Sequence, residues 1–82
     1  MTTIIGVKIQ NRIESAAEVQ VILTKHGCSI KTRIGLHNVD CGTCSPFGLI
    51  LLEVVDHEKA IEIQKDLLEI SDIEIQEMIF GS

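Results

Sequence analysis

The chain has 82 residues, of which 45% are hydrophobic, and it carries a formal net charge of −5 at pH 7. A chain this short has room for one hydrophobic core, so residues 1–82 form a single domain and two domains are excluded. The acidic charge opposes attraction to phosphate backbones, and the seven Lys and Arg residues are scattered, which argues against direct binding of DNA or RNA. With Phe47 and Phe80 as its two aromatic residues, the core must be built from Ile, Leu and Val.

The sequence indicates neither a membrane helix nor an export signal. The longest uncharged apolar run, residues 47–52, falls far short of the roughly 20 residues that a membrane helix needs, and the first residues lack the basic start and apolar core of a signal peptide. We therefore expect a cytoplasmic protein without membrane contact. Three cysteines in such a chain favour free thiols or metal ligation over a disulfide framework, and Cys28 is expected to be a small buried side chain at a strand start.

The first third of the chain predicts a strand followed by a helix. Residues 4–10 alternate between apolar and polar side chains, as a half-buried strand does. Ser15 stands three residues before Glu18 in the spacing of a helix capping box, and apolar residues then recur at helical spacing until Gly27, a natural C-terminal cap. His26 lies on the apolar stripe near the end of this helix, where a cation complements the helix dipole, so we expect a structural role for it.

The pattern returns to a period of two over residues 28–37, which predicts a second strand. Its polar face is expected to carry Lys31, Arg33 and His37. The opposite face is expected to carry Ile30, Thr32, Ile34 and Leu36. A connecting loop is predicted over residues 38–46, which are rich in turn formers.

The last third predicts a helix and a final strand. Asp56 or His57 can cap a second helix, and we read His57 as part of a helix start and not as an acid-base group. Ser71 and Asp72 break this helix, and residues 73–80 alternate again as a strand. The order βαββαβ is the ferredoxin-like split unit, an α+β fold in which a four-stranded antiparallel sheet carries both helices on one face.

The third predicted strand, residues 47–55, is apolar on both faces. Ile50, Leu52 and Val54 point to one side, and Leu49, Leu51 and Val55 point to the other. This pattern is typical of a strand that is covered on both sides, yet two helices cover only one face of such a sheet. An identical subunit is the simplest cover for the other face, so we expect a homodimer, and a tetramer also fits the pattern.

The stretch HNVDCGTCSP, residues 37–46, concentrates the candidate chemistry. His37, Cys41 and Cys44 form an H-x3-C-x2-C array whose thiolates can turn back onto one ion, such as Ni, Zn or Fe. A closed site would take its fourth ligand from Asp40, a water or a second subunit. Two alternatives stay open at this point, namely a reversible dithiol pair and a plain hairpin connection in which the cysteines carry no role.

Four segments resemble the family of iron-only hydrogenase system regulators: NRIESA at 11–16, HGCSIKTRIGLH at 26–37, CSPFGLILLEV at 44–54 and MIF at 78–80. The resemblance covers nearly the whole chain. Proteins of this family are stand-alone ACT-like domains, similar in fold to the metal-sensing domain of nickel-responsive repressors. The resemblance therefore implies an ACT-like fold and a regulatory role in assembling or expressing hydrogenase.

The resemblance also directs attention to two pairs of residues. ACT-like domains place small-molecule sites at the turn into the first helix, which corresponds here to Asn11 and Arg12. Residues 10–14 do not show the acidic residue and Pro-Gly turn that are usual in amino-acid-binding ACT domains, and the H-x-H pair of the nickel-responsive repressors is not matched. Lys31 and Arg33 could bind an anionic ligand or partner, or form a solvated or ion-paired face.

The sequence contains no Ser-His-acid set, phosphate-cradling glycine loop or convergent carboxylate pair, so we expect no enzyme activity. The leading hypothesis is a small dimeric regulatory or sensor module whose interface binds a metal ion or small ligand. Any control of transcription is expected to pass through a partner protein, because the DNA-binding ribbon of the repressors has no counterpart here. The alternatives are a metal carrier or maturation accessory that uses the HNVDCGTC loop, and a purely structural interaction domain.

Overall fold

A computed structural model describes residues 2–10, 13–40 and 43–81, with side chains over 2–10, 15–35 and 48–81. The elements follow the predicted order βαββαβ, with a short turn of 3-10 helix, Gly27–Ser29, before the second strand. The strands are β1 (Thr2–Ile9), β2 (Ile30–Asp40), β3 (Thr43–Val54) and β4 (Ile73–Phe80), and the helices are α1 (Ile13–Lys25) and α2 (His57–Leu67).

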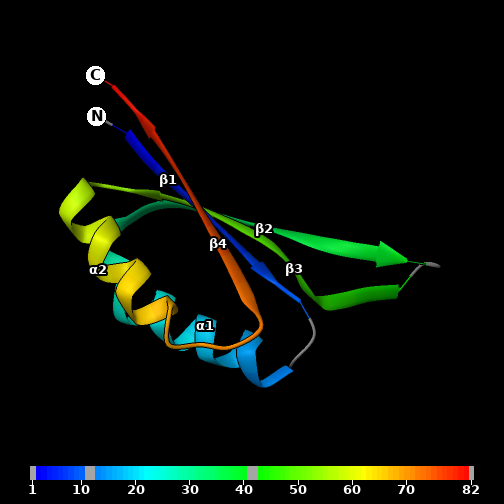
Figure 1. Ribbon diagram of the computed structural model, residues 1–82. Helices are drawn as coiled ribbons and strands as arrows, with labels where there is room; N and C mark the ends of the chain where they lie inside the picture. Colours follow the sequence, from blue (N-terminus) through cyan, green and yellow to red (C-terminus); the bar gives the residue numbers. More distant parts are fainter. Residues whose placement is uncertain (1, 11–12, 41–42, 82) are drawn as a thin grey trace.

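The four strands form one antiparallel sheet in the order β2-β3-β1-β4, so β1 and β3 are the central strands. Both helices lie on the same face of the sheet, and none of the described elements covers the other face (Figure 1). This is the ferredoxin-like α+β arrangement that the element order predicts. Within the described ranges, no helix is both long enough and apolar enough to cross a membrane.

The core lies between the sheet and the helices and is aliphatic, as predicted. Every second residue of β1 and β3 points into it, because successive side chains of a strand alternate between the two faces. Each buried Leu, Ile or Val contributes about 1.5–3 kcal/mol relative to an exposed one. The buried hydrophobic side chains are Ile5, Val7, Ile9, Val19, Leu23, Ile50, Leu52, Val54, Ala60, Ile63, Leu67 and Ile70.

Ser15 is not the N-cap that the capping-box spacing predicts. Helix α1 begins at Ile13, so Ser15 lies inside its first turn, where it is only 2% exposed. Its Oγ donates a hydrogen bond of 2.9 Å to the carbonyl oxygen of Ser71. The side chain thus joins the first helix to the segment that follows the second helix, a long-range contact that a local spacing rule cannot show.

The end of α1 also differs from the prediction. The helix ends at Lys25, and Gly27 opens the 3-10 turn instead of capping the helix. The N–H of Ser29 donates to the carbonyl oxygen of His26 at 2.9 Å and closes this turn. None of the turn's three residues is buried, and Cys28 has an exposed, free thiol, so the prediction of a buried cysteine is wrong.

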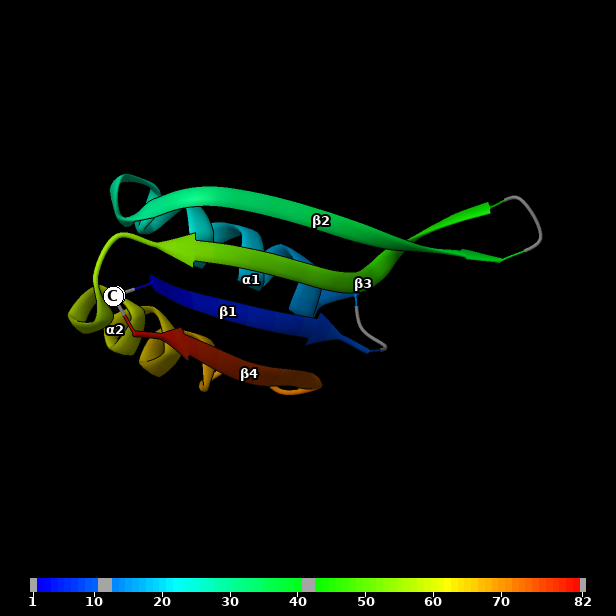
Figure 2. The same cartoon turned by 90° about the horizontal axis from the view of Figure 1, so that it is seen from above.

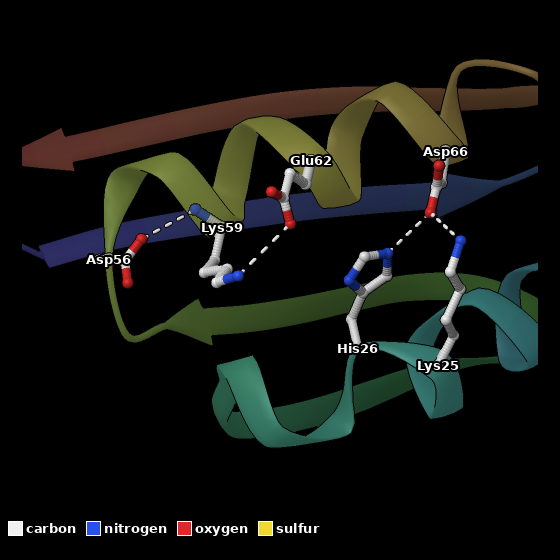
Figure 3. Close-up of polar contacts among 6 residues, drawn as sticks. All are labelled: Lys25, His26, Asp56, Lys59, Glu62 and Asp66. Atoms are coloured by element: carbon white, nitrogen blue, oxygen red, sulfur yellow. Dashed lines mark hydrogen bonds and ion pairs between the residues drawn. The ribbon is translucent and has the colours of Figure 1, made fainter.

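Helix α2 begins as predicted. Asp56 is its N-cap, and the Asp56 carboxylate accepts a hydrogen bond of 2.8 Å from the N–H of Lys59 (Figure 3). This contact satisfies one of the free N–H groups of the first turn and places a negative charge at the positive end of the helix dipole. After the helix, Asp72 has a φ of 63°, a left-handed conformation that turns the chain into β4.

A β-bulge in β2 changes which face of the sheet its residues occupy. Ile30 pairs with Val54, and the next registered pair is Thr32 with Glu53, so Lys31 is an extra residue on β2. A shift of one residue turns every later side chain of a strand to the opposite face.

For this reason the predicted shared face of Ile30, Thr32, Ile34 and Leu36 is wrong at Ile30, whereas Thr32 and Ile34 share one face as predicted. Ile30 packs against the core. Ile34 is 49% exposed and lies on the face of the sheet that the helices do not cover, which we call the open face. Arg33 turns to the helix side instead, where its guanidinium donates to the side-chain oxygen of Gln20 in α1.

The predicted loop over residues 38–46 consists largely of strand. β2 continues to Asp40 and β3 begins at Thr43, and these two residues pair with each other. β1 pairs with β3 only as far as Gly48, so the outer part of the β2–β3 hairpin extends past the rest of the sheet (Figure 2). We call this two-stranded extension beyond Gly48 the arm.

Ser15→Ala tests the connection between α1 and the segment before β4. The substitution removes a hydrogen bond from a buried hydroxyl, so we expect a loss of about 1–2 kcal/mol in the free energy of unfolding. Urea unfolding followed by circular dichroism would measure it. Thr24→Ala, at an exposed position of the same helix, is the control and should cost nothing. Equal stability of Ser15→Ala and the wild type would contradict the importance of this contact.

Candidate functional site

Of the predicted metal ligands, Asp40 and Cys44 lie on the two strands of the arm, and His37 lies at its base. Cys41 lies outside the described residues, and so do the side chains of His37, Asp40 and Cys44. The strand register gives their backbone positions, with His37 opposite Gly48 and Cys44 opposite Val39. The candidate ligands therefore come from both strands of the arm and from the residues between them. Metal binding by this set stays a prediction.

Other predicted contacts are also outside the described part of the chain. Asn11 and Arg12, the positions that resemble an ACT-like ligand site, are both outside it. Among the side chains that the structure does describe, no group of three or more His, Cys, Asp or Glu residues could hold a metal ion.

Lys31 and Arg33 do not form the shared basic face that the sequence predicts. The bulge separates them, because Lys31 is the extra residue and Arg33 follows the change of face. The Lys31 Nζ lies 3.9 Å from a carboxylate oxygen of Glu53, whereas Arg33 bonds to Gln20 on the helix side. Of the two alternatives for this pair, the ion-paired face fits Lys31, and binding of an anion by Lys31 or Arg33 stays a prediction.

The open face of the sheet is a further candidate for function. Its half-exposed apolar side chains are Ile34 of β2 at 49%, Met78 of β4 at 52% and Phe80 of β4 at 53% exposure. Strand alternation and the pairing register place the following described residues on this face: Thr2, Ile4, Gly6, Lys8, Thr32, Ile34, Leu49, Leu51, Glu53, Glu74, Gln76, Met78 and Phe80.

A hollow of about 220 Å³ lies on this face around Gly6, in the middle of the central strand β1. Its lining residues are Gly6, Lys8, Leu49, Glu74 and Gln76. A Cβ atom placed on Gly6 would lie 3.6 Å from Leu51 Cδ2 and 3.9 Å from both the Gln76 carbonyl oxygen and Leu49 Cδ1, all ordinary contact distances. The fold of the single chain therefore does not require glycine at this position.

On the opposite layer, an ionic bridge joins the two helices (Figure 3). Asp66 of α2 accepts from His26 Nε2 at 2.7 Å and from Lys25 Nζ at 3.2 Å, both at the end of α1. The hydrogen bond from His26, followed by the one from Lys25, lowers the pKa of the Asp66 carboxyl below its ordinary value. The structural role predicted for His26 is confirmed, and its partner is Asp66.

Comparison with protein-family models gives no match, and comparison with curated proteins gives none either. Among solved structures, the uncharacterized protein TM1266 from Thermotoga maritima is similar over 94% of this chain and 92% of its own, with 18% identity and a TM-score of 0.76. A formyltetrahydrofolate deformylase from Pseudomonas putida is similar over 98% of this chain, with 9% identity and a TM-score of 0.58. The present chain spans only 29% of that enzyme. These likenesses show the fold alone.

Sequence reasoning missed two of these features. Asp66 is 40 residues away from His26, and no local pattern links the two positions. Gly6 could have been found, because a glycine inside an alternating central strand weakens it and often marks a close approach to another molecule.

The Asp66 bridge predicts a defined pH dependence. The pKa of the Asp66 carboxyl is lowered from 3.8 in the folded protein, so this group takes up its proton at a lower pH in the folded protein than in the unfolded chain. The bridge therefore contributes its full stabilisation of the fold above pH 3.8. This contribution is lost as the pH falls through the pKa that Asp66 has in the folded protein. We expect Asp66→Asn to lower the urea midpoint at pH 7 and the two midpoints to converge only below pH 3.8.

Glu69→Gln is the matched control, since it removes a charge from the same segment without removing an ion pair among the described residues. A difference between Asp66→Asn and wild type that is the same at pH 7 and at pH 3 would contradict the ionic account of the bridge.

Proposed function

We propose that this domain is a small regulatory or sensor module that acts as a homodimer, with the open face of its sheet as the subunit interface. The apolar residues of the open face are the main support for this proposal. Ile34, Met78 and Phe80 are each about half exposed there, and Ile4 and Leu51 are partly exposed between them. Apolar surface gathered on one face marks an interaction site, and a second copy of the same face supplies matching surface.

The polar residues of the open face support a partner of the same kind. Lys8 is paired in register with Glu74 near one end of the face, and Lys31 lies near Glu53 towards the other end. Each region thus presents both signs of charge. A copy with the same distribution can place cations opposite carboxylates, whereas a uniformly charged partner would meet repulsion in each region.

Gly6 gives the most specific support. Glycine inside a strand costs roughly 0.5–1 kcal/mol relative to alanine, and the single chain has room for the alanine methyl group. The open space therefore serves something outside the chain. Sheets packed face to face lie about 10 Å apart with interdigitated side chains, and a hollow in one sheet accepts a side chain of the other.

The regulatory half of the proposal rests on the resemblance to iron-only hydrogenase system regulators. Such a module needs no catalytic step, and we assign it none. A ligand that prefers one arrangement of the two subunits shifts the population towards it, and a partner protein reads the result.

The cysteine pair in the arm gives the proposal two versions. In a metal sensor, binding at His37, Cys41 and Cys44 is coupled to the arrangement of the dimer. In a metal carrier, the same thiolates keep an open coordination position and pass the ion to a partner. The sensor is our first choice, because β3 runs from Cys44 directly to Leu51 on the proposed interface.

Gly6→Ala is the sharpest test of the interface. The added methyl fits the single chain but occupies the hollow, so we expect the dimer dissociation constant to rise about tenfold or more, which corresponds to about 1.4 kcal/mol of overpacking. Sedimentation equilibrium on wild type and variant would measure the constant, against a subunit mass of 9.0 kDa.

Leu68→Glu is the control, because Leu68 is 72% exposed but follows α2 and lies off the open face. It should leave the dimer constant unchanged. A wild type that sediments as a monomer at all accessible concentrations would overturn the proposal, and a Gly6→Ala dimer as tight as wild type would remove the open face from it.

Metal analysis tests the two versions that involve the arm. On protein purified anaerobically without chelator, we expect stoichiometric metal in the wild type and loss of that metal in Cys41→Ser/Cys44→Ser. Cys28→Ser, which removes an exposed thiol outside the arm, is the matched control and should keep its metal. Metal-free wild type that takes up no added Ni, Zn or Fe(II) would leave the dimer proposal standing without a metal.

A further inference from the structure

A groove of about 350 Å³ runs between the two helices, on the layer opposite the open face. It is lined by Glu18, Val21 and Ile22 of α1 and by Asp66, Glu69 and Ile70 from the C-terminal end of α2 and the turn after it. The two helices lie side by side against the sheet (Figure 1). The groove is open to solvent.

The floor of this groove is apolar and is not fully used by the fold. Ile70 is buried and Ile22 packs against the core, but Val21 is 69% exposed. A β-branched residue at an exposed helix position lowers helix propensity and here gains little burial in return. Val21 thus adds to the apolar surface of the groove and contributes little to the core.

The rim of the groove is acidic. Three of its six lining residues are carboxylates, and no Lys, Arg or His is among them. Asp66 is already held by Lys25 and His26, but the carboxylates of Glu18 and Glu69 have no ion-pair partner within the described part of the chain. An apolar floor between two free carboxylates is complementary to an apolar side chain flanked by cations.

We infer that this groove binds a basic amphipathic helical segment of a partner protein, with apolar side chains against Val21 and Ile22 and a Lys or Arg side chain between Glu18 and Glu69. Helices are recognised in this way by apolar grooves with complementary charges at the rim. The inference does not depend on the proposed dimer, because the groove and the open face lie on opposite layers of the domain. A regulatory module must contact a partner protein, and the inference places that contact on the helix side of the domain.

The probe is an amphipathic helical peptide of about 18 residues, five turns, built from Leu and Lys, with a Leu/Glu peptide of the same pattern for comparison. Fluorescence anisotropy at low salt should show binding of the Leu/Lys peptide alone. Glu18→Gln/Glu69→Gln should weaken it about tenfold, as expected for two exposed ion pairs. Glu58→Gln/Glu77→Gln carries the same net charge and leaves the groove intact, so it should change binding less than twofold.

Amide chemical shifts of the labelled protein would locate the complex. Shifts gathered on Val21, Ile22 and Ile70 support the inference. It is overturned if the peptide does not bind, if both double variants weaken binding equally, or if the shifts lie on the open face. Gly6→Ala should bind the peptide as wild type does, so a failure of the dimer proposal and a failure of this inference can be told apart.

Discussion

Two helices can cover only one face of a four-stranded sheet, and most of what distinguishes this molecule follows from that limit. The central strands β1 and β3 bury Val7, Leu52 and their neighbours beneath the helices, where the aliphatic core forms. The same strands also carry Ile4, Leu49 and Leu51 on the open face, where no helix shields them from solvent. A domain of this size, with no aromatic side chain among the buried residues that the structure describes, has a small free energy of unfolding, so covering this second apolar surface would add to its stability.

The helix layer is held together by contacts between residues far apart in the chain. The hydroxyl of Ser15 bonds to the Ser71 carbonyl near one end of α1, and Lys25 and His26 bond to Asp66 near the other. Hydrogen bonds and ion pairs of this kind contribute less than hydrophobic burial, but they are directional. They tie the two ends of α1 to α2 and to the segment after it, and Asp66 also lines the groove between the helices.

The sequence predicted the fold correctly, because alternation and helical spacing are repeated along every element and one irregular residue does not erase them. It predicted faces and boundaries less well. Lys31 is the clearest case. As an extra residue on β2 it moves the side chains that follow to the opposite face of the sheet, and a lysine is not a residue type that predicts a bulge. Ser15 looked like a cap by its spacing from Glu18, yet its hydroxyl bonds to a carbonyl 56 residues away.

For the candidate site, the residue types were readable but their grouping was not. Proline and glycine near the cysteine pair suggested a loop, whereas cross-strand pairing continues to Asp40 and Thr43, because a hairpin can tolerate turn-forming residues where only one neighbouring strand is present. The apolar character of both faces of β3 was visible in the sequence. The hollow at Gly6 was not, since it depends on which residues of β3 and β4 lie beside that glycine.

The arm has a mechanical consequence. β3 has 12 residues, which at about 3.3 Å per residue spans about 40 Å, close to the longest dimension of the molecule, 41 Å. One unbroken strand therefore begins beside the cysteine pair and ends in the core at Val54. The residues of β3 before Gly48 pair with β2 alone, whereas residues 48–54 pair with both β1 and β2. The strand is thus held on both sides within the sheet and on one side in the arm, so a displacement of the arm bends the strand most at Gly48, where the pairing with β1 begins.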